Sequence, residues 1–282
     1  MKKKEPVIKK SFLSKFLIKF IRKLGYEVID QATLHVPTKN LEANENLSES
    51  GKKSITVPLG KTKVNKKIDS LAIIIRSYTF GDIGDKKVML DQNKKRIFDS
   101  PKIEYTLRTI KSVIRSCEIA KRSFKDINIK IIISDDNSNQ ENLDKINQIL
   151  QSTNIETQII SIKDNEFNDT ISSVDTNGDK ISDNMISNMR NILKSIQIAE
   201  SDNSDLFYFL EDDYIHVDDA ITEMLFTYEK ISSQINDELF LCPADYPYLY
   251  SSIESSKIFF GNMRHWRTVN ETLITFLTSK IM

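Results

Sequence analysis

Two runs of large apolar residues end directly in clusters of acidic residues, and this pattern constrains the fold more than any other feature of the chain. Residues 129–133 are followed by Ser-Asp-Asp-Asn-Ser, and residues 206–210 are followed by Glu-Asp-Asp. Both runs are rich in β-branched or aromatic side chains and have the length of a strand. A strand that is apolar at nearly every position is typical of a parallel sheet, where both faces are buried.

Similar runs alternate with helical patterns along the rest of the chain. Further strands are predicted at 71–75, 157–162 and 239–242, and helical periodicity separates successive strands. The first of these helices is expected to start at Ser100-Pro101, with Ser100 as the N-cap. The order predicts an α/β, Rossmann-like fold with a mostly parallel central sheet. Because the carboxyl ends of parallel strands share one edge, the two acidic clusters are expected to line one cleft there.

Three zones divide the chain. Residues 1–30 are expected to form a basic amphipathic helix, residues 31–67 a polar linker or extension, and residues 68–282 the α/β domain. A helix with a basic and an apolar face can lie on an anionic membrane surface, so peripheral membrane contact is predicted through residues 1–24. The alternative is that the apolar stripe packs on the protein body. The stripe consists of Phe12, Leu13, Phe16, Leu17, Phe20, Ile21 and Leu24.

The balance of charges argues against a general nucleic-acid-binding protein. Lys plus Arg and Asp plus Glu number 40 each, so the formal net charge is +0, whereas phosphate neutralisation needs a basic excess. No stretch of about 18 uninterrupted apolar residues occurs, and the basic start does not form a secretory signal. Cys117 and Cys242 are expected to be buried thiols rather than a disulfide. We therefore expect a cytoplasmic protein that attaches, if it meets a membrane, to the inner face of the cytoplasmic membrane.

The acidic clusters suggest two kinds of binding chemistry. Three adjacent carboxylates, at residues 211–213, repel one another and are costly to bury unless a cation lies among them. Oxygen ligands suit Mg²⁺ or Mn²⁺, which often share their coordination shell with substrate phosphates. The alternative is that these acids open the next helix, although Asp218 and Asp219 precede that helix more directly. Asp135 and Asp136 could accept hydrogen bonds from a base or ribose, or could simply form a turn.

The two acid-ended strands resemble those of the GT-A fold glycosyltransferases, in particular the family-2-like group. The resemblance rests on Ile-Ile-Ile-Ser-Asp-Asp-Asn-Ser at 131–138 and Phe-Leu-Glu-Asp-Asp at 209–213, and it covers residues 71–278. In that family the first turn binds the nucleoside, and the second holds a metal ion and the diphosphate. The resemblance therefore implies a nucleotide-sugar-binding domain with Mn²⁺ or Mg²⁺. It implies Asp136 and Asp135 at the nucleoside, Glu211 and Asp213 at the metal, Asp212 at the metal or ribose, and Arg76, Ser77 and Tyr78 near the nucleotide.

The sequence also departs from that family at several points. The first strand usually ends in Pro-Thr/Ser-Tyr-Asn, which Arg-Ser-Tyr-Thr replaces at 76–79, and the Gln-x-x-Arg-Trp motif of processive members is missing. Arg264-His265-Trp266 matches that motif only in part. Arg264 and Trp266 are candidates for contact with the diphosphate or acceptor, since Arg matches phosphate geometry, although Trp266 is equally a candidate core residue. Family members often continue beyond the apparent strand at 273–277, so the resemblance leaves a C-terminal truncation of the domain open.

These features together predict an enzyme. The expected reaction moves a sugar from a nucleotide-diphospho-sugar donor to the hydroxyl of a saccharide or lipid-linked acceptor, non-processively and with a metal ion. Asp245, at the end of the predicted strand 239–242 and beside aromatic residues, is the candidate general base. A metal-dependent nucleotidyl or phosphoryl transferase would use the same acidic clusters. A non-catalytic, membrane-associated binding protein with the same fold is the third reading.

Overall fold

A computed structural model of the chain divides into two units, Met1–Lys63 and Val64–Met282, and each is described by itself. The first unit contains helix α1 (Phe12–Lys23), which lies within the residues predicted to form the amphipathic helix. The predicted linker lies almost entirely outside the described residues. The structure describes residues 12–25, 64–79, 100–174, 176–244, 246, 256–270 and 275–280.

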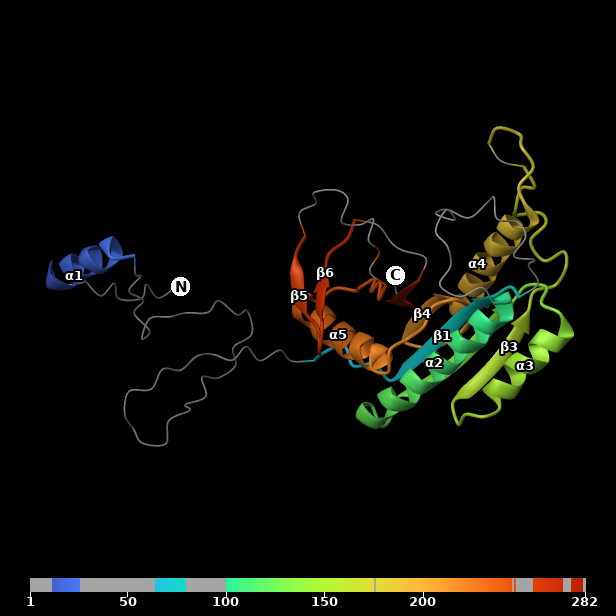
Figure 1. Ribbon diagram of the computed structural model, residues 1–282, viewed down its shortest axis with the longest axis horizontal. Coiled ribbons are helices and arrows are strands. Elements are labelled where there is room, and N and C mark those ends of the chain that lie inside the picture. The colour runs from blue at the N-terminus through green and yellow to red at the C-terminus, as the bar shows by residue number, and fades with distance from the viewer. Residues whose placement is uncertain are drawn as a thin grey trace, which may run out of the picture. The chain divides into compact units, whose positions relative to one another are not determined.

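A five-stranded sheet forms the centre of the second unit, in the order β3-β2-β1-β4-β7 (Figure 1). Its strands are β1 (Ser70–Ser77), β2 (Asn128–Asp135), β3 (Glu156–Ser161), β4 (Leu206–Glu211) and β7 (Phe276–Ser279). The first four strands run parallel, and β7 pairs antiparallel with β4. This arrangement confirms the predicted α/β fold class with a mostly parallel central sheet.

Helices cover both faces of the sheet. These are α2 (Lys102–Ser123), α3 (Gln140–Leu150), α4 (Asp183–Ser201) and α5 (Ala220–Ile235). The inward residues of α2, α3 and α5 share one core cluster with alternate residues of β1, β2 and β4. The inward residue of α4, Ile198, belongs to a second and smaller cluster with the intervening strand residues. Alternate strand residues therefore serve opposite helical layers, as the period-2 geometry of a strand requires.

The apolar periodicity of α4 predicted the helix but not its buried face. Met185 and Ile196, two of the apolar residues whose helical spacing predicts this helix, are 44% and 45% exposed. The helix instead buries small polar side chains, among them Asn191 and Ser195. Asn191 hydrogen-bonds to Ser134 of β2, and its own carbonyl accepts the hydroxyl of Ser195. Buried polar groups that are paired in this way are tolerated, so the polar face can pack on the sheet.

The predicted strand 239–242 does not form. Leu241 instead makes an isolated antiparallel bridge with Leu277 of β7, with both N···O distances at 2.8 Å. The edge of β4 is already taken by β7, so the chain at Leu241 pairs on the far side of β7. Helix α2 also starts one residue later than predicted, since Pro101 and not Ser100 is at the N-cap position, and no side chain caps the helix. Among the described residues, no helix combines the length and apolar character needed to cross a membrane.

The pair formed by buried Tyr208 and half-buried His216 links β4 to the segment before α5. Tyr208 lies in the core, its hydroxyl is 2.9 Å from Nε2 of His216, and the two rings meet edge to face. Nδ1 of His216 is buried without a hydrogen-bond partner in the described part of the chain. Burial lowers the pKa of His216 from its ordinary value of 6.5 to about 4. The imidazole is therefore neutral in the folded protein at neutral pH.

This pair predicts a loss of stability on acidification. The unfolded chain binds a proton at His216 near pH 6.5, but the folded protein does so only near pH 4, so stability falls as pH drops through this window. The full contribution is about 3 kcal/mol. His216→Gln should flatten the dependence of the unfolding free energy on pH between these values, as measured by urea denaturation. An unchanged slope in the variant would contradict the buried neutral imidazole.

Candidate active site at the strand ends

The carboxyl ends of β1, β2 and β4 meet at one edge of the sheet. In the register of the sheet, Ser77 of β1 pairs with Asp135 of β2, and Arg76 pairs with Glu211 of β4. The acidic clusters therefore lie on either side of β1 at the same edge, as predicted. The strand order reverses between β1 and β4, and this is the place where ligands bind in open parallel sheets. We call the polar residues around these three strand ends the strand-end site.

Asp135 builds the turn that follows β2. Its carboxylate accepts hydrogen bonds from the backbone N–H of Ser138 at 3.1 Å and from the Ser138 hydroxyl at 2.5 Å. Asn137 takes the left-handed conformation, with φ of 65°, which Asn tolerates better than most residues. The Ser138 hydroxyl accepts in turn from the backbone N–H of Thr79. Burial raises the pKa of Asp135, and the hydrogen bonds from Ser138 oppose that rise. The Ser138 contacts lie within the turn itself, so Asp135 has the contacts of a turn residue.

Asp136 is buried against a cation from α4. Only 2% of this residue is exposed, and its Oδ1 lies 3.2 Å from Nη1 of Arg190. The Arg190 guanidinium also donates from Nη2 to the backbone carbonyl of Lys163, while its Nε is buried without a partner in the described residues. Two further hydrogen bonds hold α4 at this edge, because Asn191 donates to the carbonyl of Ser77 and pairs with Ser134.

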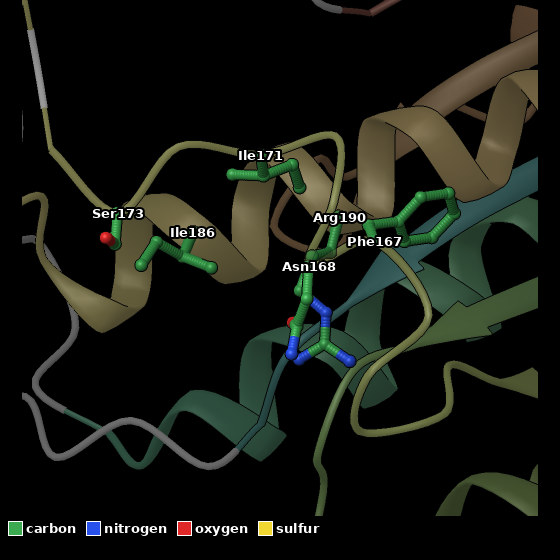
Figure 2. Close-up of a pocket in the computed structure, with 6 residues that line it drawn as sticks. All are labelled: Phe167, Asn168, Ile171, Ser173, Ile186 and Arg190. Atoms are coloured by element: carbon green, nitrogen blue, oxygen red, sulfur yellow. The ribbon is translucent and has the colours of Figure 1, made fainter.

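Arg190 also lines a pocket of about 340 Å³ (Figure 2). Its volume is near the lower end of the range of small-molecule sites. The lining combines apolar side chains with an amide, a hydroxyl and a guanidinium, so it offers both surface for a ring and donors for polar atoms. Arg190 connects this pocket to Asp136. The lining residues are Phe167, Asn168, Ile171, Ser173, Ile186 and Arg190.

Arg76 carries a buried positive charge between β1 and α4. Its Nη2 lies 3.3 Å from Oε1 of Glu211, within ion-pair distance but without hydrogen-bond alignment, and its Nη1 donates to Asn188 at 3.4 Å. Burial lowers the pKa of Arg76, and the neighbouring acids oppose that shift. Burial likewise raises the pKa of Glu211, opposed chiefly by Arg76. Each group thus favours the charged form of the other.

Asp212 faces the opposite layer of the domain and holds three groups together. Its Oδ2 accepts from the Thr106 hydroxyl at 2.9 Å and from the backbone N–H of Tyr78 at 3.4 Å. Its Oδ1 lies 3.6 Å from Nζ of Lys102, which in turn sits 5.3 Å from the centre of the Tyr78 ring. Asp212 therefore fixes the end of β1 to the first turn of α2. Asp213, the next residue, is exposed.

The three acids of the turn 211–213 consequently do not converge on one point. Glu211 pairs with Arg76 on the α4 side, and Asp212 pairs with Lys102 on the α2 side. Among the described residues, no group of three or more His, Cys, Asp or Glu side chains could hold a metal ion. Mg²⁺ is commonly bound by only one or two carboxylates together with substrate phosphates, so a smaller donor set would be enough for that ion.

Arg264 and Trp266 lie elsewhere, on a hairpin of β5 (Ile258–Phe260) and β6 (His265–Arg267) that the sequence did not predict. Trp266 donates from Nε1 to the buried carboxylate of Glu223 at 3.0 Å, and Nη2 of Arg264 lies 3.1 Å from Asp219. Both contacts are with the start of α5. Figure 1 shows the hairpin beside α5, away from the carboxyl end of β1.

The structure thus brings together most of the residues singled out in the sequence. Those at the strand-end site are Arg76, Ser77, Tyr78, Asp135, Asp136, Glu211, Asp212 and Asp213. Arg264 and Trp266 are not among them, and Asp245 lies outside the described residues. Because 239–242 is not a strand, Asp245 does not follow a strand end as expected.

Sequence reasoning found Arg76 but missed the other groups that pair with the acids, which are Lys102, Thr106 and Arg190. The positions of Lys102 and Thr106 could have been predicted from the sequence. The helix that follows the first strand of a parallel sheet starts at the carboxyl edge, so the beginning of that helix lies near the site. The role of Arg190 could not have been predicted, since its position in the middle of α4 gives no indication that its side chain reaches the end of β2.

Comparisons with known proteins add little to this geometry. No family model matches the chain, and no curated protein matches it. Among solved structures, the chain is similar to core-mannan synthase A (CmsA/Ktr4) from Aspergillus fumigatus in its Mn/GDP form, with a TM-score of 0.24 and 10% sequence identity. The similarity covers 55% of this chain and 41% of that chain, so less than half of the mannan synthase is matched.

The contacts of Asp212 predict a structural role that can be measured. Asp212→Ala would leave the Thr106 hydroxyl, the Tyr78 N–H and the Lys102 ammonium without their acceptor, at a cost of about 3 kcal/mol in unfolding free energy. Asp218→Ala is the control, because Asp218 pairs with the exposed Arg115 and should contribute less than about 1 kcal/mol. Equal losses in denaturant melts of the two variants would contradict the bridging role.

Proposed function

We propose that the chain is a metal-dependent, non-processive glycosyltransferase that uses a nucleotide-diphospho-sugar donor in the cytoplasm. The observation that carries this proposal is the placement of Asp136 and the 211–213 turn on either side of β1, at the reversal of the strand order. A nucleotide diphosphate bound along this edge would reach both acidic clusters. The resemblance of both strand-end motifs to those of the GT-A glycosyltransferases supports the same assignment.

The pocket beside Arg190 gives the donor an orientation. In our proposal the base or ribose occupies this pocket, where Arg190 and Asn168 supply donors and Phe167 and Ile171 supply apolar surface. The diphosphate then extends past the end of β1 toward the 211–213 turn. In the opposite orientation the phosphates would meet Arg190, whose charge is already paired with Asp136.

The charges at the strand-end site call for an added cation. Among the described residues, five carboxylates and three cations lie at the strand-end site, which leaves an excess of two negative charges before a diphosphate binds. One divalent ion offsets this excess, and Glu211 and Asp213 are the residues we assign to hold Mn²⁺ or Mg²⁺. Such an ion would neutralise the charge that develops on the leaving diphosphate. The carboxylates are Asp135, Asp136, Glu211, Asp212 and Asp213, and the cations are Arg76, Lys102 and Arg190.

The proposed reaction is a substitution at the anomeric carbon of the donor sugar. The acceptor hydroxyl, on a saccharide or a lipid-linked saccharide, loses its proton to a carboxylate base while its oxygen bonds to that carbon. The bond from the carbon to the diphosphate oxygen breaks, and nucleoside diphosphate leaves with the electron pair. Asp245 remains our proposed base, on the strength of the sequence alone.

The deciding experiment is a thermal-shift screen of nucleotide sugars with and without Mn²⁺, followed by product analysis. A ligand that binds only the folded protein raises its melting temperature by mass action. Release of nucleoside diphosphate would support sugar transfer, and release of pyrophosphate would identify a nucleotidyl transferase instead. Binding without turnover of any donor would favour a non-catalytic binding protein.

The metal assignment predicts a difference between two aspartates. Asp213→Asn should weaken Mn²⁺-dependent nucleotide binding at least about tenfold, because it removes a charged ligand of the ion. Asp219→Asn should leave that binding unchanged, because Asp219 pairs with Arg264 beside α5. Isothermal titration with nucleoside diphosphates and Mn²⁺ measures both. Equal effects would remove the reason to place the metal at the 211–213 turn.

The pocket assignment predicts a role for Arg190. Arg190→Lys keeps the positive charge near Asp136 but loses the planar fork of donors, so nucleoside diphosphate affinity should fall about tenfold or more. Arg115→Lys is the matched control, because Arg115 pairs with the exposed Asp218. The same titration without metal separates this effect from the metal site. Unaltered affinity of Arg190→Lys for every nucleoside diphosphate would place the base outside the pocket.

A further inference from the structure

Helix α1 and the residue that follows it carry large apolar side chains that are exposed. Phe16, Leu17 and Phe20 of the helix and Leu24 directly after it are 66%, 57%, 55% and 59% exposed. Their spacing places them on one side of the helix, because residues four apart in an α-helix lie one above the other. Large apolar side chains gathered on one face indicate an interaction surface, whereas single exposed ones do not.

The charge of α1 is entirely of one sign. The sequence of the helix, FLSKFLIKFIRK, has four basic residues and no acidic residue. Lys19 and Lys23 are exposed on the helix surface. The rest of the chain compensates this charge, since the whole sequence has a formal net charge of +0. The positive charge is therefore concentrated on the helix that also carries the exposed aromatic and leucine side chains.

We infer that α1 binds the surface of a lipid bilayer that contains anionic lipids. Lysines are attracted to the negative surface potential, and the adjacent apolar face enters the boundary between headgroups and acyl chains. A nucleic acid would match the basic residues but would leave the apolar face exposed. The interaction is independent of the proposed sugar transfer and adds a second binding function to the chain.

The length of α1 fixes how it meets the bilayer. Its 12 residues span about 18 Å, whereas a helix that crosses the hydrocarbon core needs roughly 20 apolar residues. The basic residues within α1 would also be costly in the centre of a bilayer. The helix therefore lies in the plane of the interface, and its binding is reversible and sensitive to salt.

The test is co-sedimentation of the full chain with vesicles. Phosphatidylcholine vesicles that contain phosphatidylserine should bind the chain, and pure phosphatidylcholine vesicles should bind it far more weakly. The double variant Lys19→Glu/Lys23→Glu should lower the affinity for the anionic vesicles at least about tenfold. A matched control, Lys111→Glu/Lys125→Glu, makes the same charge change at exposed lysines of the α/β domain and should bind as the natural chain does.

A second variant tests the apolar face. Phe16→Ser/Phe20→Ser should reduce vesicle binding to a similar extent, while the melting temperature of the chain stays unchanged. A lowered melting temperature would show that the stripe packs on the protein and would overturn the inference. Failure of the natural chain to bind anionic vesicles, or an equal loss in the control variant, would overturn it as well.

Discussion

The burial of β1 between two parallel partners is the constraint on which the rest of the domain depends. Residues 71–75 are fully buried, and β1 pairs residue by residue with β2 on one side and β4 on the other. This register brings Ser77 level with Asp135 and Arg76 level with Glu211. A slip of one residue would turn every side chain of β1 to the opposite face and move Arg76 from the α4 layer to the α2 layer. The strand-end site is therefore a direct consequence of how β1 packs.

The elements that could be predicted from the sequence are the strands whose two faces are both buried. β1, β2 and β4 each read as apolar runs because helices cover both of their faces, and such runs have few competing explanations. The site followed from the same reasoning, since polar residues directly after buried strands must emerge at a common edge of a parallel sheet. The positions of Asp136 and of the 211–213 turn were predictable for this reason, and so was the alternation of strands and helices.

The features that the sequence did not reveal depend on partners far away in the chain. Helix α4 packs through Asn191 and Ser195 because Ser134 and the carbonyl of Ser77 hydrogen-bond to Asn191. No local sequence pattern predicts that a polar helix face packs on the sheet. The apolar residues Met185 and Ile196 of the same helix are exposed. The antiparallel pairing of β7, which overlaps the strand expected at 273–277, and the short β5–β6 hairpin are likewise set by non-local contacts. The three-residue strands of the hairpin carry too little periodicity to be recognised.

The acids of the 211–213 turn illustrate how tertiary partners divide the roles of adjacent residues. Three neighbouring carboxylates look equivalent in the sequence, but strand geometry sends successive side chains to opposite faces. Glu211 thereby meets Arg76, and Asp212 meets Lys102 and Thr106, so each of these carboxylates is engaged by a donor from a different element. Asp213 lies two residues beyond the end of β4 and is exposed. The cations of β1 and α2, which lie more than 100 residues earlier in the chain, therefore give the adjacent acids Glu211 and Asp212 different partners.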